Sequence, residues 1–302
     1  MKKFIAIITN RNFILLLAII LGLSLNTVSW IKHFTVPALA IVMVVSLTQI
    51  SFKEFLSARK IIIPSLYTIL FNYFIFGAVM LLMAWFLIDD KQLWIGFVIL
   101  ASSPPGVAIA PFAYIIGADE KYSIIGMVGA YIASLAIIPI AAFIFIGKNF
   151  ASPLDVFIIF VELIIAPMIV SQLLVKLRLD RHLLKWRGAI VNWGLFVVIF
   201  AVVSLNRDVF FSDIKTLLII SLISFVSVFG LWGAANLILK KLKIKTGIRK
   251  SLVLAATIKN SGFAAATALA LFGEKSSLPG AILSIFLIIF LIIISIVEKK
   301  KS

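Results

Sequence analysis

The 302-residue chain contains no cysteine, only two histidines, and few charged residues, which make up 13% of the sequence. The absence of cysteine excludes disulfides, thiolate metal sites and cysteine nucleophiles, and two histidines in different polar segments cannot form a histidine-rich metal site. Hydrophobic residues make up 63%, against about 45–50% in soluble domains. This composition predicts a polytopic helical membrane protein, because a soluble fold could not bury so much apolar surface.

The sequence also lacks the signatures of common enzymes. It contains no Walker motif, no HExxH, no GxSxG and no paired catalytic carboxylates. We therefore expect a protein that is not an enzyme, with no catalytic residues, no metal and no other cofactor.

Long apolar runs separated by charged clusters predict an all-α fold with ten membrane-spanning helices. The expected spans cover residues 13–30, 35–51, 61–88, 92–117, 122–147, 154–175, 187–205, 214–239, 248–272 and 277–297.

Lysine and arginine outnumber aspartate and glutamate by 28 to 12, and they gather in alternate loops. With a cytoplasmic N-terminus, the inside segments carry 21 basic residues and the outside segments carry six. The positive-inside rule then predicts a multi-pass protein of the plasma (inner) membrane with both termini in the cytoplasm. The alternative is that these loops bind lipid headgroups or nucleic acid. We favour the interpretation that the basic residues only set the orientation of the chain in the membrane, and we expect neither a nucleic-acid partner nor an obligate protein partner.

Two of the predicted helices are interrupted by residues that break helices. The fourth span contains Ser103-Pro-Pro-Gly106, whose prolines lack backbone donors, and the ninth contains Lys259-Asn-Ser-Gly262. Counted from opposite ends of their spans, both breaks lie about 13–18 Å deep, near the midplane. A simple kink is the alternative, since proline and glycine are tolerated in membrane helices.

The two breaks lie about 155 residues apart, close to half the chain length. This offset relates residues 1–150 to residues 151–302 as two five-helix repeats of inverted topology, each with a discontinuous fourth helix. That pattern is typical of secondary transporters with a substrate site where the broken helices cross. Because helix N-termini with free N–H groups would point at the crossing, we expect the site to favour an anion.

Four segments resemble one family of carriers. They begin at Arg11 (Arg-Asn-Phe-Ile-Leu), Pro37 (Pro-Ala-Leu-Ala), Ser103 (Ser-Pro-Pro-Gly-Val-Ala) and Asn260 (Asn-Ser-Gly-Phe-Ala). The sequence is similar to the bile acid:sodium symporter family, within the bile-acid, arsenite and riboflavin transporter superfamily. The resemblance implies a core domain of helices 3, 4, 5, 8, 9 and 10 and a panel domain of helices 1, 2, 6 and 7. It also implies import of an organic anion with two sodium ions bound behind the crossing of helices 4 and 9.

The chain departs from the family pattern at the expected sodium ligands. Ile109-Ala110 stands where the family has Ser-Asn, while Ala255 and Lys259 stand where it has a glutamate and a glutamine. Asn72 corresponds best to the helix-three glutamine. Oxygen ligands suit sodium and an ammonium would repel it, so the resemblance implies that two-sodium coupling is lost here.

Lys259 is the one basic residue that the 21 inside and six outside positions leave unassigned, and it lies within the ninth span, while Glu162 is the one carboxylate well inside a span. Charges in the membrane are costly unless paired or hydrated, so each is a functional candidate and the other its expected partner. The alternatives are that Lys259 snorkels towards water and that Glu162 has a local structural role. We predict that the Lys259 amine replaces the bound sodium, and a lysine, unlike an arginine, is also able to carry a proton.

The sequence therefore predicts an alternating-access carrier for a small organic anion in the lipid bilayer, independent of sodium and with proton coupling as an option. The alternatives are a sodium-coupled organic-anion symporter and a non-transporting membrane receptor or scaffold with the same fold. Candidate residues of the cation site are Lys259, Asn72, Thr257, Asn260 and Glu162. Candidate substrate contacts at the crossing are Ser102, Ser103, Gly106, Val107, Ser261 and Gly262.

Overall fold

The computed structural model describes residues 10–25, 29–48, 58–147, 158 and 161–299. Both chain ends and the start of the predicted sixth span lie outside these residues. Over the described ranges the regular secondary structure is helical, and the chain pairs as in a sheet only at one isolated antiparallel bridge between residues 105 and 259. The first half of the chain contains α2 (Arg11–Ser24), η1 (Ser29–Ile31), α3 (Lys32–Leu47), α4 (Ala58–Ile69), η3 (Leu70–Phe76), α5 (Gly77–Leu87), α6 (Lys91–Ser102), α7 (Ile109–Ile115) and α8 (Glu120–Phe145).

The first described element of the second half is η4, which follows α8. The elements of this half are η4 (Val161–Ile165), α10 (Ala166–Lys176), α11 (Asp180–Leu183), α12 (Arg187–Leu205), α13 (Arg207–Ser212), α14 (Ile214–Phe225), η5 (Val226–Gly230), α15 (Leu231–Lys241), α16 (Thr246–Ala255), α17 (Ser261–Phe272) and α18 (Glu274–Lys299).

Five helices are long and apolar enough to cross a membrane. They span Ile61–Leu87, Glu120–Phe145, Arg187–Leu205, Ile214–Lys241 and Glu274–Val297. Shorter apolar helices include α3, α6 and α17. The latter two have 12 residues each, which corresponds to about 18 Å at 1.5 Å per residue. Neither could cross a hydrocarbon core of about 30 Å alone.

Two of the long helices contain a π-helical segment near the middle. The segment Leu70–Phe76 joins α4 to α5, and Val226–Gly230 joins α14 to α15. A π segment locally alters the i to i−4 ladder and often occurs at functional sites. The two segments begin about 155 residues apart, the same offset that separates the two helix breaks.

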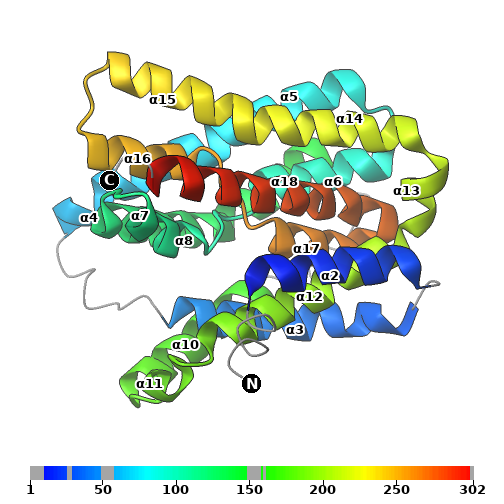
Figure 1. Cartoon of the computed structure of the whole chain (residues 1–302), viewed down its shortest axis with the longest axis horizontal. Helices are drawn as coiled ribbons and strands as arrows, with labels where there is room; N and C mark the ends of the chain where they lie inside the picture. Colours follow the sequence, from blue (N-terminus) through cyan, green and yellow to red (C-terminus); the bar gives the residue numbers. More distant parts are fainter. Residues whose placement is uncertain (1–9, 26–28, 49–57, 148–157, 159–160, 300–302) are drawn as a thin grey trace.

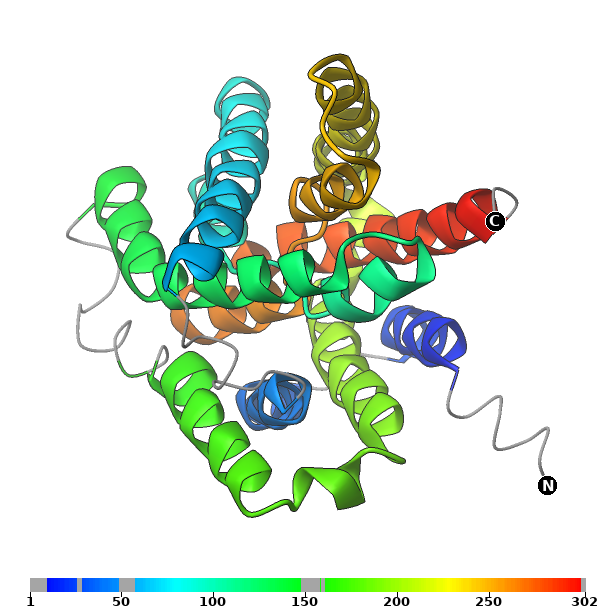
Figure 2. The ribbon, with the colours of Figure 1, turned by 90° about the vertical axis from the view of Figure 1, so that its left-hand side faces the viewer.

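The helices pack as two groups, which Figure 2 shows end-on. α2, α3, α10 and α12 pack against one another on one side of the molecule. The remaining long helices surround α6 and α17, with α18 packing against both. α12 and α3 contact α17, so the two groups meet beside the break between α16 and α17.

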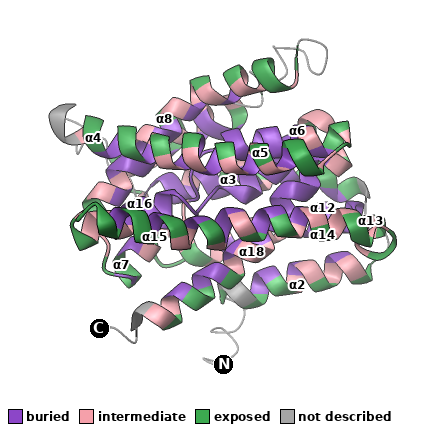
Figure 3. Ribbon diagram, turned by 90° about the horizontal axis from the view of Figure 1, so that it is seen from above, coloured by how far each residue is buried: buried purple, intermediate pink, exposed green. Residues whose placement is uncertain are grey.

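The outer surface is strongly apolar, as expected for helices in contact with lipid. Figure 3 shows buried residues in the middle of the molecule and exposed residues along the outward faces of α2, α5 and α15. The exposed residues include large hydrophobic side chains such as Trp85 (70%) and Phe86 (75%). Such a surface would aggregate in water but is stable against acyl chains.

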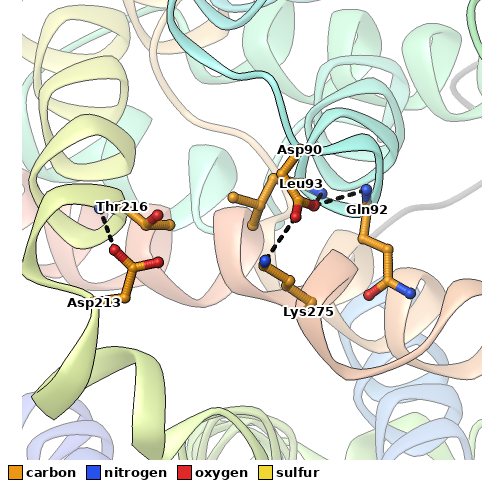
Figure 4. Close-up of polar contacts among 6 residues, drawn as sticks. All are labelled: Asp90, Gln92, Leu93, Asp213, Thr216 and Lys275. Carbon is orange, nitrogen blue, oxygen red and sulfur yellow. Dashed lines mark hydrogen bonds and ion pairs between the residues drawn. The ribbon is translucent and has the colours of Figure 1, made fainter.

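Polar side chains stabilise several helix starts outside the apolar spans (Figure 4). Asp90 accepts hydrogen bonds from the backbone N–H groups of Gln92 and Leu93 and an ion pair from Lys275 Nζ at 2.6 Å. Partial burial acts to raise the pKa of Asp90, but the hydrogen bond from Lys275 and the backbone donors outweigh it, so the pKa is lowered. Asp213 caps α14 through the N–H of Thr216, and hydrogen bonding from the Thr216 hydroxyl together with this N–H lowers the pKa of Asp213.

Candidate functional site

Both interrupted helices stop and restart where the sequence predicts the breaks. α6 ends at Ser102 and α7 begins at Ile109, because Pro104 and Pro105 have no N–H to continue the helical ladder. α16 ends at Ala255 and α17 begins at Ser261. Asn260 starts the new helix, because its side-chain oxygen accepts a hydrogen bond from the N–H of Phe263 at 3.1 Å.

The two non-helical segments cross and bind each other through their backbones. The N–H of Gly106 donates to the carbonyl of Ile258 at 3.0 Å, and the N–H of Asn260 donates to the carbonyl of Pro104 at 2.9 Å. The pair forms an antiparallel bridge centred on Pro105 and Lys259. A Cβ on Gly106 would lie 2.8 Å from both the Lys259 carbonyl oxygen and Ile258 Cγ2, so this approach requires glycine.

Lys259 points from this bridge into the end of the other broken helix. Its Nζ donates to the carbonyl oxygens of Ala101 at 2.7 Å and Ser103 at 2.8 Å. The same Nζ lies 4.4 Å from the ring centroid of Tyr73 and 5.6 Å from that of Phe76. The residue is only 2% exposed. The ammonium is therefore held by the negative C-terminal end of α6 and by two aromatic faces.

Asn72 has the equivalent role at the end of α16. Its side-chain amide donates to the carbonyl of Ala255 at 2.9 Å and to that of Ile258 at 3.4 Å. These are backbone acceptors that the helix break leaves without an intrahelical donor. The Oδ1 of Asn72 is buried and has no hydrogen-bond partner among the described residues.

Asn260 connects the crossing to neighbouring helices. Its Nδ2 donates to the hydroxyl of Tyr131 on α8 at 3.1 Å and to Met43 Sδ on α3 at 3.5 Å. Tyr73, whose ring lies beside the Lys259 amine, donates its hydroxyl to the carbonyl of Ala130 at 2.8 Å. The crossing is thus connected by side chains to α8, which packs with α6, and to α3, which belongs to the other group of helices.

A cavity of about 50 Å³ lies between the crossing and the helices α2, α3, α12 and α18. Gly106, Val107 and Ala108 line it from one break, and the segment 258–262 lines it from the other. The opposite wall is apolar. It is formed by Leu15, Val42, Leu195, Ile199, Leu287, Ile288 and Leu291, with Ser284 beside them.

Comparison with protein-family models gives one match, to the sodium bile acid symporter family, over residues 36–213. The match covers more than half of the chain. The chain belongs to this family. A comparison with curated proteins gave no match.

Membership of the sodium bile acid symporter family settles the broad class of function. Its members are transporters, so this chain is a transporter and not an enzyme. Together with the five long apolar helices, it also identifies a multi-pass membrane protein. Among the described residues, no group of three or more His, Asp or Glu side chains is placed to hold a metal ion.

The structure brings most of the predicted site residues to the crossing. Gly106, Val107, Lys259, Ser261 and Gly262 line the cavity, as does Asn260. The side chains of three others turn back to their own helices instead. The hydroxyl of Ser102 donates to Val98 and Ile99, that of Ser103 to Leu100, and that of Thr257 to Val253 and Leu254, in each case to a carbonyl oxygen.

Glu162 lies away from the crossing in the described structure. It is exposed on η4, which packs against α3 and α10. Lys259 forms its contacts with carbonyl oxygens and aromatic rings, and no ion pair links it to a carboxylate of the described residues. The expected pairing of these two charges is therefore not formed.

Sequence reasoning missed several groups that complete the site. The acceptors of the Lys259 amine are backbone carbonyls, which no residue type reveals, and Tyr73 and Phe76 gave no signal beyond hydrophobicity. Ser284 on α18 donates to the hydroxyl of Ser261 at 2.8 Å. Small residues recur every four positions along α18 at Ser276, Gly280 and Ser284, a pattern that indicates close helix packing, and Gly280 lies against Ala265.

Proposed function

We propose that this member of the sodium bile acid symporter family is a secondary carrier for a small organic anion that does not require sodium. The observation that carries the proposal is the position of the Lys259 amine, 2.7 and 2.8 Å from two carbonyl oxygens at the end of α6. Carbonyl oxygens at a helix C-terminus are typical ligands of a bound sodium ion. A covalently attached ammonium occupies that environment and would repel a second cation.

The preference for an anion follows from the positive charge of Lys259, which backbone carbonyls stabilise but no carboxylate neutralises among the described residues. Lys259 is buried beside the cavity without a carboxylate partner among the described residues. A buried positive charge in the membrane is stabilised by a nearby negative ligand. The first turn of α17, which contributes Ser261 and Gly262 to the cavity wall, adds the positive end of a helix dipole.

We further propose that the ten predicted helices form two inverted repeats, residues 1–150 and 151–302. Three pairs of features support this division at one offset of about 155 residues. They are the two helix breaks, the two π segments, and the long helices α8 and α18 that follow the breaks. In this scheme α2, α3, α10 and α12 form the panel, and the helices around α6 and α17 form the core.

Alternating access between these domains fits the size of the cavity. A volume of about 50 Å³ has room for a few water molecules but not for an organic acid. The apolar residues of α2, α3 and α12 on its far wall must therefore move relative to the crossing before substrate can enter. We propose that the described conformation is occluded.

We also propose that both termini are cytoplasmic in the plasma (inner) membrane. Arg178, Arg181 and Lys185 lie in the polar segment between α10 and α12, on the side to which the positive-inside rule assigns the cytoplasm. The chain has no native cysteine, so single cysteines placed by Arg181→Cys and Glu274→Cys can be labelled without background. Labelling of Arg181→Cys from outside intact cells would overturn this orientation.

The proposed function is tested with purified protein in liposomes. We expect uptake of at least one organic acid in sodium-free medium, with no increase when sodium is added. The sodium-coupled alternative predicts a sodium requirement, together with thermal stabilisation by sodium of about 2.7 kcal/mol at 100 times its Kd. The receptor alternative predicts saturable binding of an acid without any flux. Either result would contradict the proposal.

A further inference from the structure

A second and larger cavity lies far from the crossing, at the opposite end of α16. It has a volume of about 430 Å³ and opens between the end of α15, the beginning of α16 and the last turns of α18, which meet at the left of Figure 1. Its lining residues are Ile116, Trp232, Asn236, Leu237, Lys240, Thr246, Arg249, Lys250, Val253 and Ile294. The transport mechanism described above uses none of them.

The polar side of this cavity is cationic. Lys240, Arg249 and Lys250 line it, and none of the described lining residues is acidic. Lys250 is engaged, because its Nζ donates to the carbonyl of Ile116 at 2.5 Å. Arg249 has an unused donor, since its Nε is buried without a hydrogen-bond partner among the described residues. A buried guanidinium N–H without a partner is costly, and a bound anion would satisfy it.

Hydroxyl and amide groups add further donors on the same wall. Thr246, the first residue of α16, lies beside Arg249, and Asn236 faces them from α15. The residue before α16, Lys245, provides no side-chain cap for the free N–H groups of its first turn. A tetrahedral phosphate group, with several acceptor oxygens pointing in different directions, matches this set of donors better than a planar anion.

The other side of the cavity is apolar and continuous with the lipid-facing surface. Trp232, Leu237 and Ile294 form it, and Leu237 is 65% exposed. The site also lies at the end of an apolar span, Ile214–Lys241, where lipid headgroups meet the protein. A soluble anion would gain nothing from this apolar wall, whereas acyl chains would cover it.

We propose that this cavity binds the phosphate of an anionic membrane phospholipid, with its acyl chains against Leu237 and the exposed face of α15. The cationic groups at Lys240 and Arg249 bind the headgroup. Because α16 continues into the break at Lys259, an occupied site would hold together the helices α15, α16 and α18 that support the crossing. The inference does not depend on the substrate or the coupling ion of the carrier.

The test uses the full-length protein in nanodiscs of phosphatidylcholine, into which phosphatidylglycerol is titrated. We expect saturable binding of about one phosphatidylglycerol at this site by native mass spectrometry, with a higher melting temperature. Arg249→Gln should weaken binding about tenfold or more, since it removes a charge-assisted hydrogen bond. Lys241→Gln is the control, because it also removes one positive charge, next to Lys240, at a position that does not line the cavity. This control should bind like the unmodified protein.

Three results would overturn the proposal. The first is equal loss of binding in Arg249→Gln and Lys241→Gln, which would indicate general attraction to a basic surface. The second is unchanged binding in Arg249→Gln, provided that the variant keeps the melting temperature of the parent in pure phosphatidylcholine. The third is equal stabilisation by inorganic phosphate or glycerol phosphate, which would identify a site for a free anion.

Discussion

The ammonium of Lys259 and the carbonyl of Ser103 lie 2.8 Å apart, although the two residues are separated by 156 positions in the chain. This contact joins the two broken helices through a charge rather than through an ion from solution. If it replaces a bound sodium, as we propose, then the properties of the carrier depend on the lysine in ways that substitutions can reveal.

The first prediction concerns the loss of the charge. We expect Lys259→Ala to lower transport at least tenfold, because the carbonyls of Ala101 and Ser103 are left buried without a donor. An alkylammonium ion such as methylammonium, added at millimolar concentration, should restore part of the activity by entering the vacated space. Flux into liposomes measures both effects. Normal transport by Lys259→Ala in sodium-free buffer would show that the residue is only a tolerated buried lysine.

The second prediction separates a fixed cation from a proton carrier. Lys259→Arg keeps a positive charge that cannot be released in the physiological pH range. A variant that exchanges substrate but no longer responds to a pH gradient would identify the amine as the proton carrier. If instead binding is lost completely, the lysine has a structural or anion-binding role. Counterflow and gradient-driven uptake, measured on the same liposomes, distinguish the two results.

The third prediction tests the close approach at the crossing. Gly106→Ala should destabilise the protein by about 1–3 kcal/mol and abolish transport, because the new methyl group would contact the Lys259 backbone at 2.8 Å. Gly233→Ala, within α15, is the control. A Cβ there meets no atom within 4 Å, and alanine favours the helix by up to about 1 kcal/mol. Thermal unfolding in detergent measures both variants, and equal behaviour of the two would contradict the described crossing.

The fourth prediction concerns the Asn72 amide. Asn72→Leu keeps the volume but removes the donor that serves the carbonyls of Ala255 and Ile258, so we expect a loss of about 1–3 kcal/mol in stability. Ser295→Ala is a suitable comparison, since the Ser295 hydroxyl only donates to the carbonyl of Leu291 in its own helix. If Asn72→Leu lowers the unfolding free energy less than Ser295→Ala does, the end of α16 does not depend on the Asn72 amide.

The fifth prediction is a pH dependence of stability from the ion pair of Asp90 and Lys275. The pKa of Asp90 is lowered in the folded state, so its contribution is complete above the unfolded value of about 3.9 and is lost as the pH falls through the folded pKa. Both side chains are more than a third exposed, which limits the contribution to at most about 1 kcal/mol. The difference in unfolding free energy between the parent and Asp90→Asn should therefore shrink below about pH 4. A difference that grows with acidity would contradict the assignment.

The helix breaks could be predicted because their causes are local. A proline such as Pro104 or Pro105 has no N–H in any fold. Asn260 caps α17 by accepting a hydrogen bond from the N–H of Phe263, only three residues away. The direction of a hydroxyl is not fixed in this way. A serine or threonine in a helix can face a ligand or donate to a carbonyl one turn back, and the two cases have the same sequence pattern. Ser103 and Thr257 do the second.

The environment of Lys259 could be predicted only in part. Its burial follows from its depth in an apolar span, but its acceptors are main-chain atoms of a helix far away in sequence. The failure of the pairing with Glu162 has a similar origin. Depth along a helix says nothing about its rotation, and the rotation of η4 leaves that carboxylate exposed.

The antiparallel bridge between Pro105 and Lys259 has a consequence for motion. Reciprocal backbone bonds tie the two breaks together, so neither half can shift without carrying the other. The facing wall offers Leu15, Val42, Leu195 and Ile199, whose contacts have no preferred direction, and the Asn260 amide reaches across only to the weak acceptor Met43 Sδ at 3.5 Å. Directional hydrogen bonds thus lie within the crossing, whereas its boundary with α2, α3 and α12 consists mainly of apolar contacts. In the proposed alternating access, the crossing would therefore move as one rigid unit, and sliding would occur at the apolar boundary next to it.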